Sequence, residues 1–189
     1  TNTDHSNSGT SSGGSGSGSG SSGSGSGGSG GSGGSSGSSG SAGSGSGGGV
    51  RVSVDGSFEM YQDAGIYGCV ASGYGEGDGS GGGVEIDGGG SGESGTFVMH
   101  GGTIASCVAG RMGGGIGNDG VFIMEDGAIR SCSAIGYGGE EAMGGSIRFS
   151  GDMTISGGTI SAEGADGKKQ HIFGRGAFTI SGNAQINAS

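Results

Sequence analysis

Residues 81–109 decide the fold, and their sequence is GGGVEIDGGGSGESGTFVMHGGTIASCVA. Near the end of this stretch two apolar residues, Phe97 and Met99, are separated by one residue. Ile104 follows five residues after Met99, and Cys107 comes three residues later. Alternation of apolar and other residues with a period of two is typical of a short β-strand with one buried face. This stretch therefore predicts short strands joined by glycine-rich turns.

The same pattern occurs five times in the chain. Each copy has two apolar residues separated by one, an isoleucine five or six residues later, a small or polar residue three positions beyond it and, in four copies, an alanine two positions further on. The aligned residues are Phe58/Met60, Phe97/Met99, Phe122/Met124, Met153/Ile155 and Phe178/Ile180, then Ile66, Ile104, Ile129, Ile160 and Ile186, then Cys69, Cys107, Cys132, Glu163 and Ser189, and finally Ala71, Ala109, Ala134 and Ala165. Agreement at so many offsets indicates an internal repeat.

A glycine-rich entry precedes the paired apolar residues and leads into another short alternating run, as at 48–52, 82–86 and 144–149. In these runs we expect Arg51, Glu85 and Arg148 to point outward while their neighbours point inward. Glycine and aspartate also fill the turns between the second and third runs, where positive φ angles are needed.

The spacing of the repeat selects one kind of all-β fold. Successive isoleucines are 38, 25, 31 and 26 residues apart. A unit of about 25 residues holds three short strands and three corners, which is one coil of a parallel β-helix, a repeat architecture whose neighbouring strands lie about 4.8 Å apart. We therefore predict a short right-handed parallel β-helix of about five coils. The longer units carry extra loops at 73–82, 88–95 and 136–143.

Other glycine-rich or repetitive folds fit less well. The chain has 58 glycines in 189 residues, but it has no proline and its glycines do not recur strictly at every third position, which excludes collagen. A propeller blade needs about 40–50 residues and four strands. A sandwich would not repeat its side-chain identities in this way. No helical periodicity is visible.

The chain divides near residue 49. Residues 1–49 are almost wholly Ser and Gly, and such a segment buries too little apolar surface to offset the entropy lost on ordering. We predict that 1–49 is a disordered, low-complexity tether and that 50–189 is the β-helix repeat domain. A glycosylated serine-rich stalk and an ordered glycine packing remain alternatives for 1–49.

The charge excludes several classes of partner. The formal net charge is −10, and all seven basic residues lie after position 50, so no basic stripe is present to bind a nucleic acid or an anionic membrane surface. No apolar run reaches the length of a membrane span. The chain starts at Thr1 without a basic and apolar leader, so we expect a mature product or a fragment.

The unit Gly-Gly-Gly-Val-x-Ile followed by Thr-Phe-Val-Met-x-Gly-Gly-Thr-Ile-x-x-Cys-x-Ala, over 81–109, resembles the glycine-rich β-helix repeats of bacterial cell-surface and adhesin-like proteins. These are similar in fold to the pectate-lyase-like superfamily. Residues 144–147, Gly-Gly-Ser-Ile, also resemble the tetrad of polymorphic outer-membrane adhesins, although the Phe-x-x-Asn motif of that subfamily is absent. The resemblance covers residues 48–189 and implies an extracellular or cell-surface location. It says little about function, because such folds have many functions.

Candidate metal and thiol sites are weak. Residues 114–122 fit one copy of the calcium-binding nonapeptide with Asp119 as the oxygen donor, but that site needs tandem copies. We expect no metal and no cofactor. The repeat stacks Cys69, Cys107 and Cys132 in one column, either as small buried side chains or as a disulfide with one thiol left over.

Candidate catalytic acids are scattered along the repeats, and we expect no catalysis. They are Asp63, Asp126, Asp152, Glu163 and Asp166. The function that we expect is that of a structural or adhesive module, a rigid β-solenoid that displays loops to glycans or proteins of a host or cell surface. One alternative is a carbohydrate-binding or polysaccharide-cleaving β-helix that uses Asp63, Asp126 and Asp152. Another is a self-associating segment, because the last repeat shows no cap and predicts an open edge.

Overall fold

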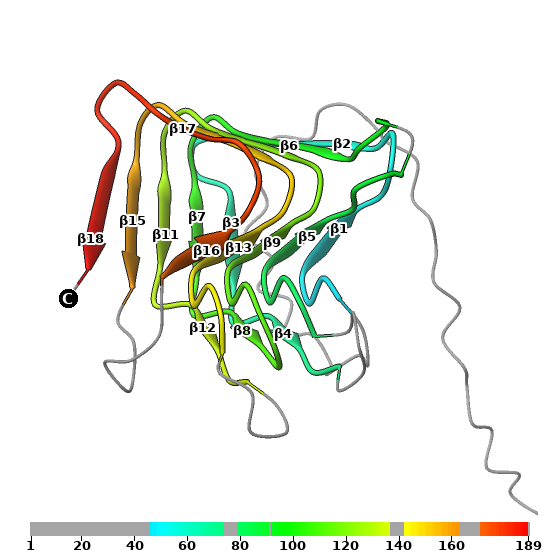
Figure 1. Cartoon of the computed structure of the whole chain (residues 1–189). Helices are drawn as coiled ribbons and strands as arrows, with labels where there is room; N and C mark the ends of the chain where they lie inside the picture. Colours follow the sequence, from blue (N-terminus) through cyan, green and yellow to red (C-terminus); the bar gives the residue numbers. More distant parts are fainter. Residues whose placement is uncertain (1–45, 74–78, 91, 137–141, 163–170, 189) are drawn as a thin grey trace, which may run out of the picture.

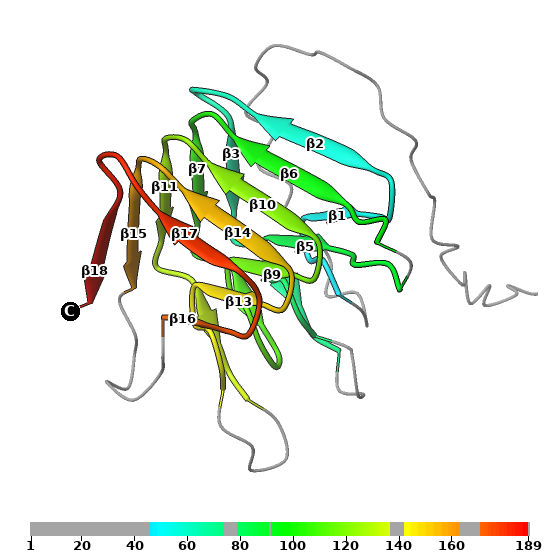
Figure 2. The same cartoon turned by 45° about the horizontal axis from the view of Figure 1, so that its top comes forward.

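A computed structural model describes residues 46–73, 79–90, 92–136, 142–162 and 171–188, and the predicted tether lies outside them up to residue 45. All eighteen strands of this part stack in parallel (Figures 1 and 2). Sheet 1 contains β1 (Val50–Val52), β5 (Val84–Ile86), β9 (Ile116–Asn118), β13 (Ile147–Phe149) and β16 (Ile172–Gly174). Sheet 2 contains β2 (Ser57–Met60), β6 (Thr96–Met99), β10 (Val121–Met124), β14 (Asp152–Ile155) and β17 (Phe178–Ile180).

Two further sheets complete the cross-section. Sheet 3 contains β3 (Gly65–Tyr67), β7 (Thr103–Ala105), β11 (Ala128–Arg130), β15 (Thr159–Ala162) and β18 (Gln185–Ala188). Sheet 4 contains β4 (Val70–Ala71), β8 (Val108–Ala109) and β12 (Ser133–Ala134). Each strand pairs with its counterpart one repeat away, so the chain winds as a parallel β-helix of five coils. The predicted all-β class and coil number are confirmed. The part of the chain that is described contains no helix long and apolar enough to cross a membrane.

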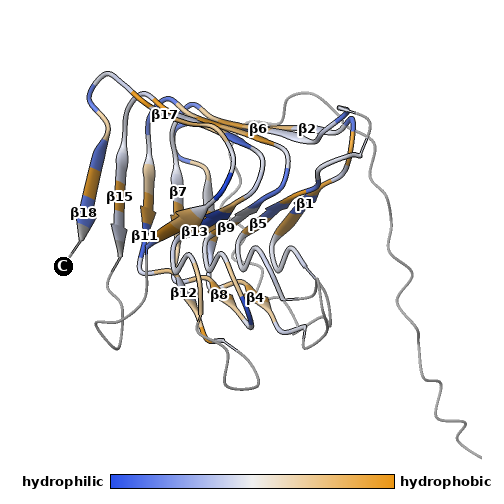
Figure 3. Ribbon diagram, viewed as in Figure 1, coloured by the Kyte–Doolittle hydropathy of each residue, from blue (hydrophilic) through white to orange (hydrophobic). Residues whose placement is uncertain are grey.

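The predicted columns form the core. Phe58 pairs with Phe97, which pairs with Phe122, and the ring centroids of these neighbours lie 5.1 and 5.2 Å apart. The isoleucine column is equally in register, with Ile104 beside Ile66 and Ile129. The inward-facing large apolar side chains of coils two to four are buried, most of them fully. Figure 3 shows the alternation, with hydrophobic colour recurring at matching places of neighbouring strands.

Sheet 4 was not predicted. The repeat unit led us to expect three strands in a coil, whereas each of the first three coils has four. The fourth strand follows the cysteine column and is only two residues long, as in Val108–Ala109. Two residues are too few for a period of two to be visible in the sequence.

The glycine-rich segments that precede the strands of sheet 1 pack directly against the backbone of sheet 4. A Cβ on Gly48 or Gly82 would lie 2.6 Å from the carbonyl carbon of Val70 or Val108, respectively. On Gly114 it would overlap the backbone of Ser133. Real Cβ atoms do not approach backbone so closely, so these positions need glycine for close contact between two backbone segments.

Glu85 departs from the prediction that it points into solvent. Arg51 on the same face is exposed, but Glu85 is only 5% exposed. Its carboxylate occupies the space left by the missing side chain of Gly117, on the next strand, and lies against Gly81 in the glycine entry. The turn of the entry therefore covers this part of sheet 1.

The loop predicted at 88–95 is a small excursion at the corner between sheets 1 and 2. Gly88 and Ser94 form an isolated antiparallel bridge, and the Gly95 amide donates to the Asp87 carbonyl at 2.8 Å. The chain thus returns to the corner that it left, and β6 starts in register with β2. The other two predicted loops are described only at their ends.

Candidate functional site

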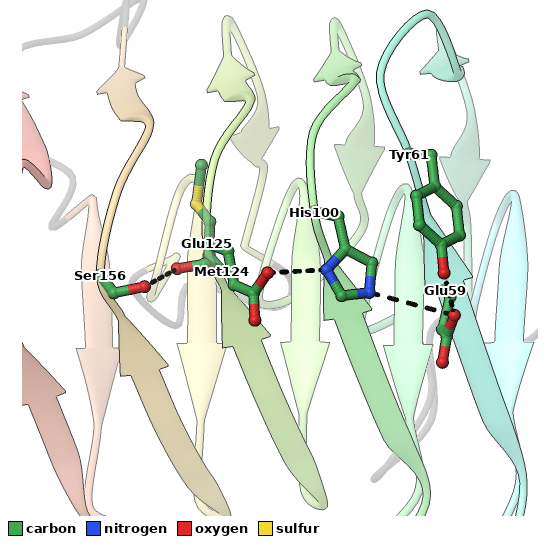
Figure 4. Close-up of polar contacts among 6 residues, drawn as sticks. All are labelled: Glu59, Tyr61, His100, Met124, Glu125 and Ser156. Atoms are coloured by element: carbon green, nitrogen blue, oxygen red, sulfur yellow. Dashed lines mark hydrogen bonds and ion pairs between the residues drawn. The ribbon is translucent and has the colours of Figure 1, made fainter.

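A row of polar side chains follows sheet 2. Tyr61, His100, Glu125 and Ser156 each stand directly after a strand of this sheet, in four successive coils. Because the strands are in register, the four residues lie in line along the solenoid (Figure 4). We call Tyr61, His100, Glu125 and Ser156, with Glu59 of β2, the corner row.

Side-chain contacts connect the residues of the corner row across the first three coils. The Nδ1 of His100 lies 2.7 Å from Oε2 of Glu125 and donates to it, since a carboxylate only accepts. The Nε2 of the same ring lies 3.9 Å from Oε2 of Glu59. The hydroxyl of Tyr61 donates to that same oxygen, and this bond raises the pKa of Tyr61. His100 is thus held between two carboxylates.

The ring of Tyr61 stacks on His100, with centroids 4.7 Å apart and planes 24° apart. Tyr61 nevertheless remains 57% exposed. Ser156 continues the row by donating from Oγ to the Met124 carbonyl at 3.3 Å. An exposed aromatic ring bordered by carboxylates and a hydroxyl can pack against an apolar or sugar-like surface and accept hydrogen bonds at its rim.

The opposite edge of sheet 2, where its strands begin, has a cavity of about 440 Å³. Its polar lining comes from Ser94, Thr96, Asp119 and Asp152, together with glycine backbone. Asp119 is engaged by Nη1 of Arg148 and Oγ of Ser150. The buried Asn118 forms two hydrogen bonds at the same corner.

Asn118 shapes this corner through both ends of its amide. It donates from Nδ2 to the Asp152 carbonyl at 3.0 Å, and its Oδ1 accepts from the Gly120 amide at 3.0 Å. Two corner turns of neighbouring coils are thereby tied together. The outer face of sheet 2 lies between this cavity and the corner row, with Val98 and Ile123 half-buried near its centre.

The structure separates the candidate acids. Asp63 and Asp126 lie in turns that follow β2 and β10, on the side of the corner row. Asp63 takes the positive-φ position, at 71°, that glycine fills in other coils, and Asp126 accepts from the Gly127 amide at 2.7 Å. Asp152 starts β14 and lines the cavity at the opposite edge. Glu163 and Asp166 lie outside the described residues.

The segment that fits the calcium-binding nonapeptide lies at the corner beside the cavity. Its Asp119 is already bound by Arg148 and Ser150, and its Asn118 is buried. Within the ranges that the structure covers, no three His, Cys, Asp or Glu side chains are arranged to hold a metal ion.

The cysteine column is buried beside sheet 4. Cys69, Cys107 and Cys132 are free thiols, and Cys107 and Cys132 donate to the Ala105 and Arg130 carbonyls at 3.4 and 3.3 Å. The interaction with Cys132, together with burial, raises the pKa of Cys107, and burial raises the pKa of Cys69. These two groups are therefore protonated and pack as small apolar side chains at neutral pH.

A charged cluster surrounds Glu85 on sheet 1. Arg51 pairs with Asp87 at 2.9 Å, and Arg148 pairs with Asp119. Among the described residues, none forms a hydrogen bond with the buried Oε2 of Glu85. Burial first, and then the nearby charge of Asp119, raise the pKa of Glu85 to about 8. Glu85 is therefore mainly uncharged at neutral pH.

Sequence reasoning missed the corner row and the cavity. The residue after each apolar pair changes from Tyr to His to Glu to Ser, so a search for repeated side chains passes over it. The sequence feature that could have revealed the row is its constant position, directly after the second residue of each apolar pair. The cavity combines an insertion in coil two with corners of coils three and four, which a one-dimensional repeat does not show.

The chain was compared with family models, curated proteins and solved structures. No family model, no curated protein and no solved structure matches this chain.

Proposed function

We propose that this chain is a structural and adhesive module that acts outside the cell, where a rigid β-solenoid presents the outer face of sheet 2 and its corners to a partner. One observation carries the proposal: an exposed row of aromatic and carboxylate side chains stands beside a core built from in-register columns of large apolar side chains. The repeat holds outward groups at steps of about 4.8 Å. Such a surface suits an extended glycan or a protein of a host or cell surface.

Rigidity favours a display role. Columns of large apolar side chains run through coils two to four, with Met153 and Ile155 of coil four in register with Phe122 and Met124 of coil three, and close-packed interiors of this kind deform little. The partner then meets side chains that are already ordered, which lowers the entropy lost on binding. Tyr61, stacked on His100, is the best anchor in the row because exposed aromatic side chains are frequent hot spots.

The test uses the full chain, immobilised and screened against arrays of glycans and surface proteins. We expect binding that Tyr61→Ala weakens about tenfold or more, as for an aromatic hot spot. Tyr67→Ala is the matched control, because Tyr67 is 49% exposed in the same coil but belongs to sheet 3. Equal loss in both variants, or no binding partner on either array, would contradict the proposal.

Carbohydrate binding in the cavity is a second candidate. It is supported by the volume of about 440 Å³, which lies in the range of small-ligand sites, and by the carboxylates of Asp119 and Asp152. Asp63 and Asp126 lie at the other edge of sheet 2, so they do not join Asp152 as a pair for glycoside cleavage, which needs two carboxyl groups within about 10 Å. Asp119, the other carboxylate of the cavity, is already bound by Arg148 and Ser150. We therefore expect binding without turnover. Polysaccharide cleavage that Asp152→Asn abolishes would overturn that expectation.

A further inference from the structure

The cavity at the start of sheet 2 is built from three neighbouring strands and the turns that lead into them. Thr96 of β6, Val121 of β10 and Asp152 of β14 line it from the outer face of the sheet, where they stand in register. These three strands lie side by side in Figure 2. Ser94, in the excursion before β6, and the corner turns before β10 and β14 complete the lining. All lining residues therefore belong to coils two to four.

Hydrogen-bonding groups dominate this lining. The hydroxyls of Ser94 and Thr96 can each donate and accept a hydrogen bond. Glycines at three further lining positions leave backbone amide and carbonyl groups without a covering side chain. Val121 alone has a wholly apolar side chain among the lining residues. A polar cavity of this kind suits a ligand with many hydroxyl groups better than one with a long apolar chain.

The two carboxylates of the cavity differ in their partners. Asp119 accepts hydrogen bonds at Oδ1 from Arg148 and Ser150, and the charge of Arg148 balances its own. The side chain of Asp152 forms no hydrogen bond or ion pair with any residue that the structure describes. The described lining also contains no lysine or arginine. The cavity therefore presents one negative charge without a counter-charge.

The backbone of Asp152 is fixed although its carboxylate has no partner. Its carbonyl accepts from Nδ2 of the buried Asn118 at 3.0 Å, and its amide donates to the Gly120 carbonyl at 2.8 Å. The carboxylate is thus presented from a rigid strand, so that binding of a cation costs little ordering of the protein.

We propose that the cavity binds a sugar unit that carries a protonated amino group, with the ammonium on the carboxylate of Asp152. Ser94, Thr96 and the glycine backbone bind the hydroxyls of the same sugar. The contact to Asp152 is a charge-assisted hydrogen bond, which is about twice as strong as a neutral one. A lysine side chain offers the same ammonium, but its apolar stem finds only Val121. The inference rests on carbohydrate binding in the cavity, the second candidate function, and adds the charge of the ligand.

The test is isothermal titration calorimetry of the full chain with three oligosaccharides of equal length and linkage, built from glucosamine, N-acetylglucosamine and glucose. Mildly acidic buffer keeps the amino groups of the glucosamine oligomer protonated. We expect this oligomer to bind about tenfold or more tighter than the other two, as one charge-assisted hydrogen bond provides. A lysine oligomer, which has the charge without the hydroxyls, should bind no more tightly than the neutral sugars.

Two variants test whether the charge acts in the cavity. Asp152→Asn removes the charge but keeps the size of the side chain, and should lower the affinity for the glucosamine oligomer to that for the neutral sugars. Asp126→Asn is the matched control, because it removes the same charge at the opposite edge of sheet 2 and keeps the Oδ1 that accepts from Gly127. It should leave the affinity unchanged. Circular dichroism verifies that both variants are folded.

The outcomes separate this inference from the functions on which it builds. Equal affinity for the three sugars, equal loss in the two variants, or tighter binding of the lysine oligomer overturns the inference and leaves carbohydrate binding intact. A chain that binds none of the three sugars overturns both. Tyr61→Ala tests the corner row independently, because Tyr61 does not line the cavity.

Discussion

The burial of Glu85 is explained by a glycine in the neighbouring coil, which leaves space for the Glu85 side chain. Gly117 lies opposite it in register on β9 and has no side chain. The carboxyl group of Glu85 lies in that space, and its Oε2 has no hydrogen-bond partner within the part of the chain that the structure describes. A buried carboxylate without a full set of hydrogen bonds is costly in its charged form, so the group retains its proton. The cost should appear in the pH dependence of folding.

Glu85→Gln should remove a pH-dependent loss of stability. The pKa of Glu85 rises from 4.5 to about 8 on folding, so between these values the folded state holds a proton that the unfolded state has released. The free energy of unfolding of the wild type then falls as pH rises through this range, by up to about 1.4 kcal/mol per pH unit. Urea unfolding at several pH values should show the variant gaining on the wild type as pH rises. Parallel curves for the wild type and Glu85→Gln would contradict the assigned burial of Glu85.

The glycine-rich segments that precede the strands of sheet 1 determine how closely sheet 1 and sheet 4 approach each other. They bring the backbone of one segment against sheet 4, and at Gly114 any side chain would overlap the backbone of Gly145 and Ser133. Since backbone cannot rotate away as a side chain can, Gly114→Ala should push the entry off sheet 4.

Gly114→Ala should lower the free energy of unfolding by about 3 kcal/mol, at the upper end of overpacking effects. Gly90→Ala is the matched control, because a Cβ at Gly90 would meet nothing within 4 Å. That substitution should change stability by less than about 1 kcal/mol. Chemical denaturation measures both, and equal stability of the two variants would show that the entry does not need close backbone contact.

The elements also show what the sequence can predict. The strands of sheets 1 to 3 were predictable because their inward residues are large, apolar and repeated, as in the column of Ile66, Ile104 and Ile129. Sheet 4 was not, since its strands are shorter than the period that would identify them. The corner row was missed because Tyr61 and His100 share a position and a stacking contact but no chemical type. The burial of Glu85 depends on a glycine one coil away.

At the scale of the whole molecule, the described residues form a one-dimensional stack, in which the strands of each coil contact chiefly the strands of the neighbouring coils. In such proteins stability is the sum of coil terms and interface terms, and the ends have one interface fewer. Coil five has exposed core residues on its outer side, whereas the inward residues of coil three, such as Phe122 and Met124, are fully buried. The free energy of local opening should therefore differ along the solenoid.

Native-state hydrogen exchange should reveal this gradient. We expect the amides of β10 in coil three to exchange only through global unfolding, and those of β17 in coil five to exchange through local opening at lower free energy. Uniform protection from β10 to β17 would show that the fifth coil is as stable as the centre of the solenoid.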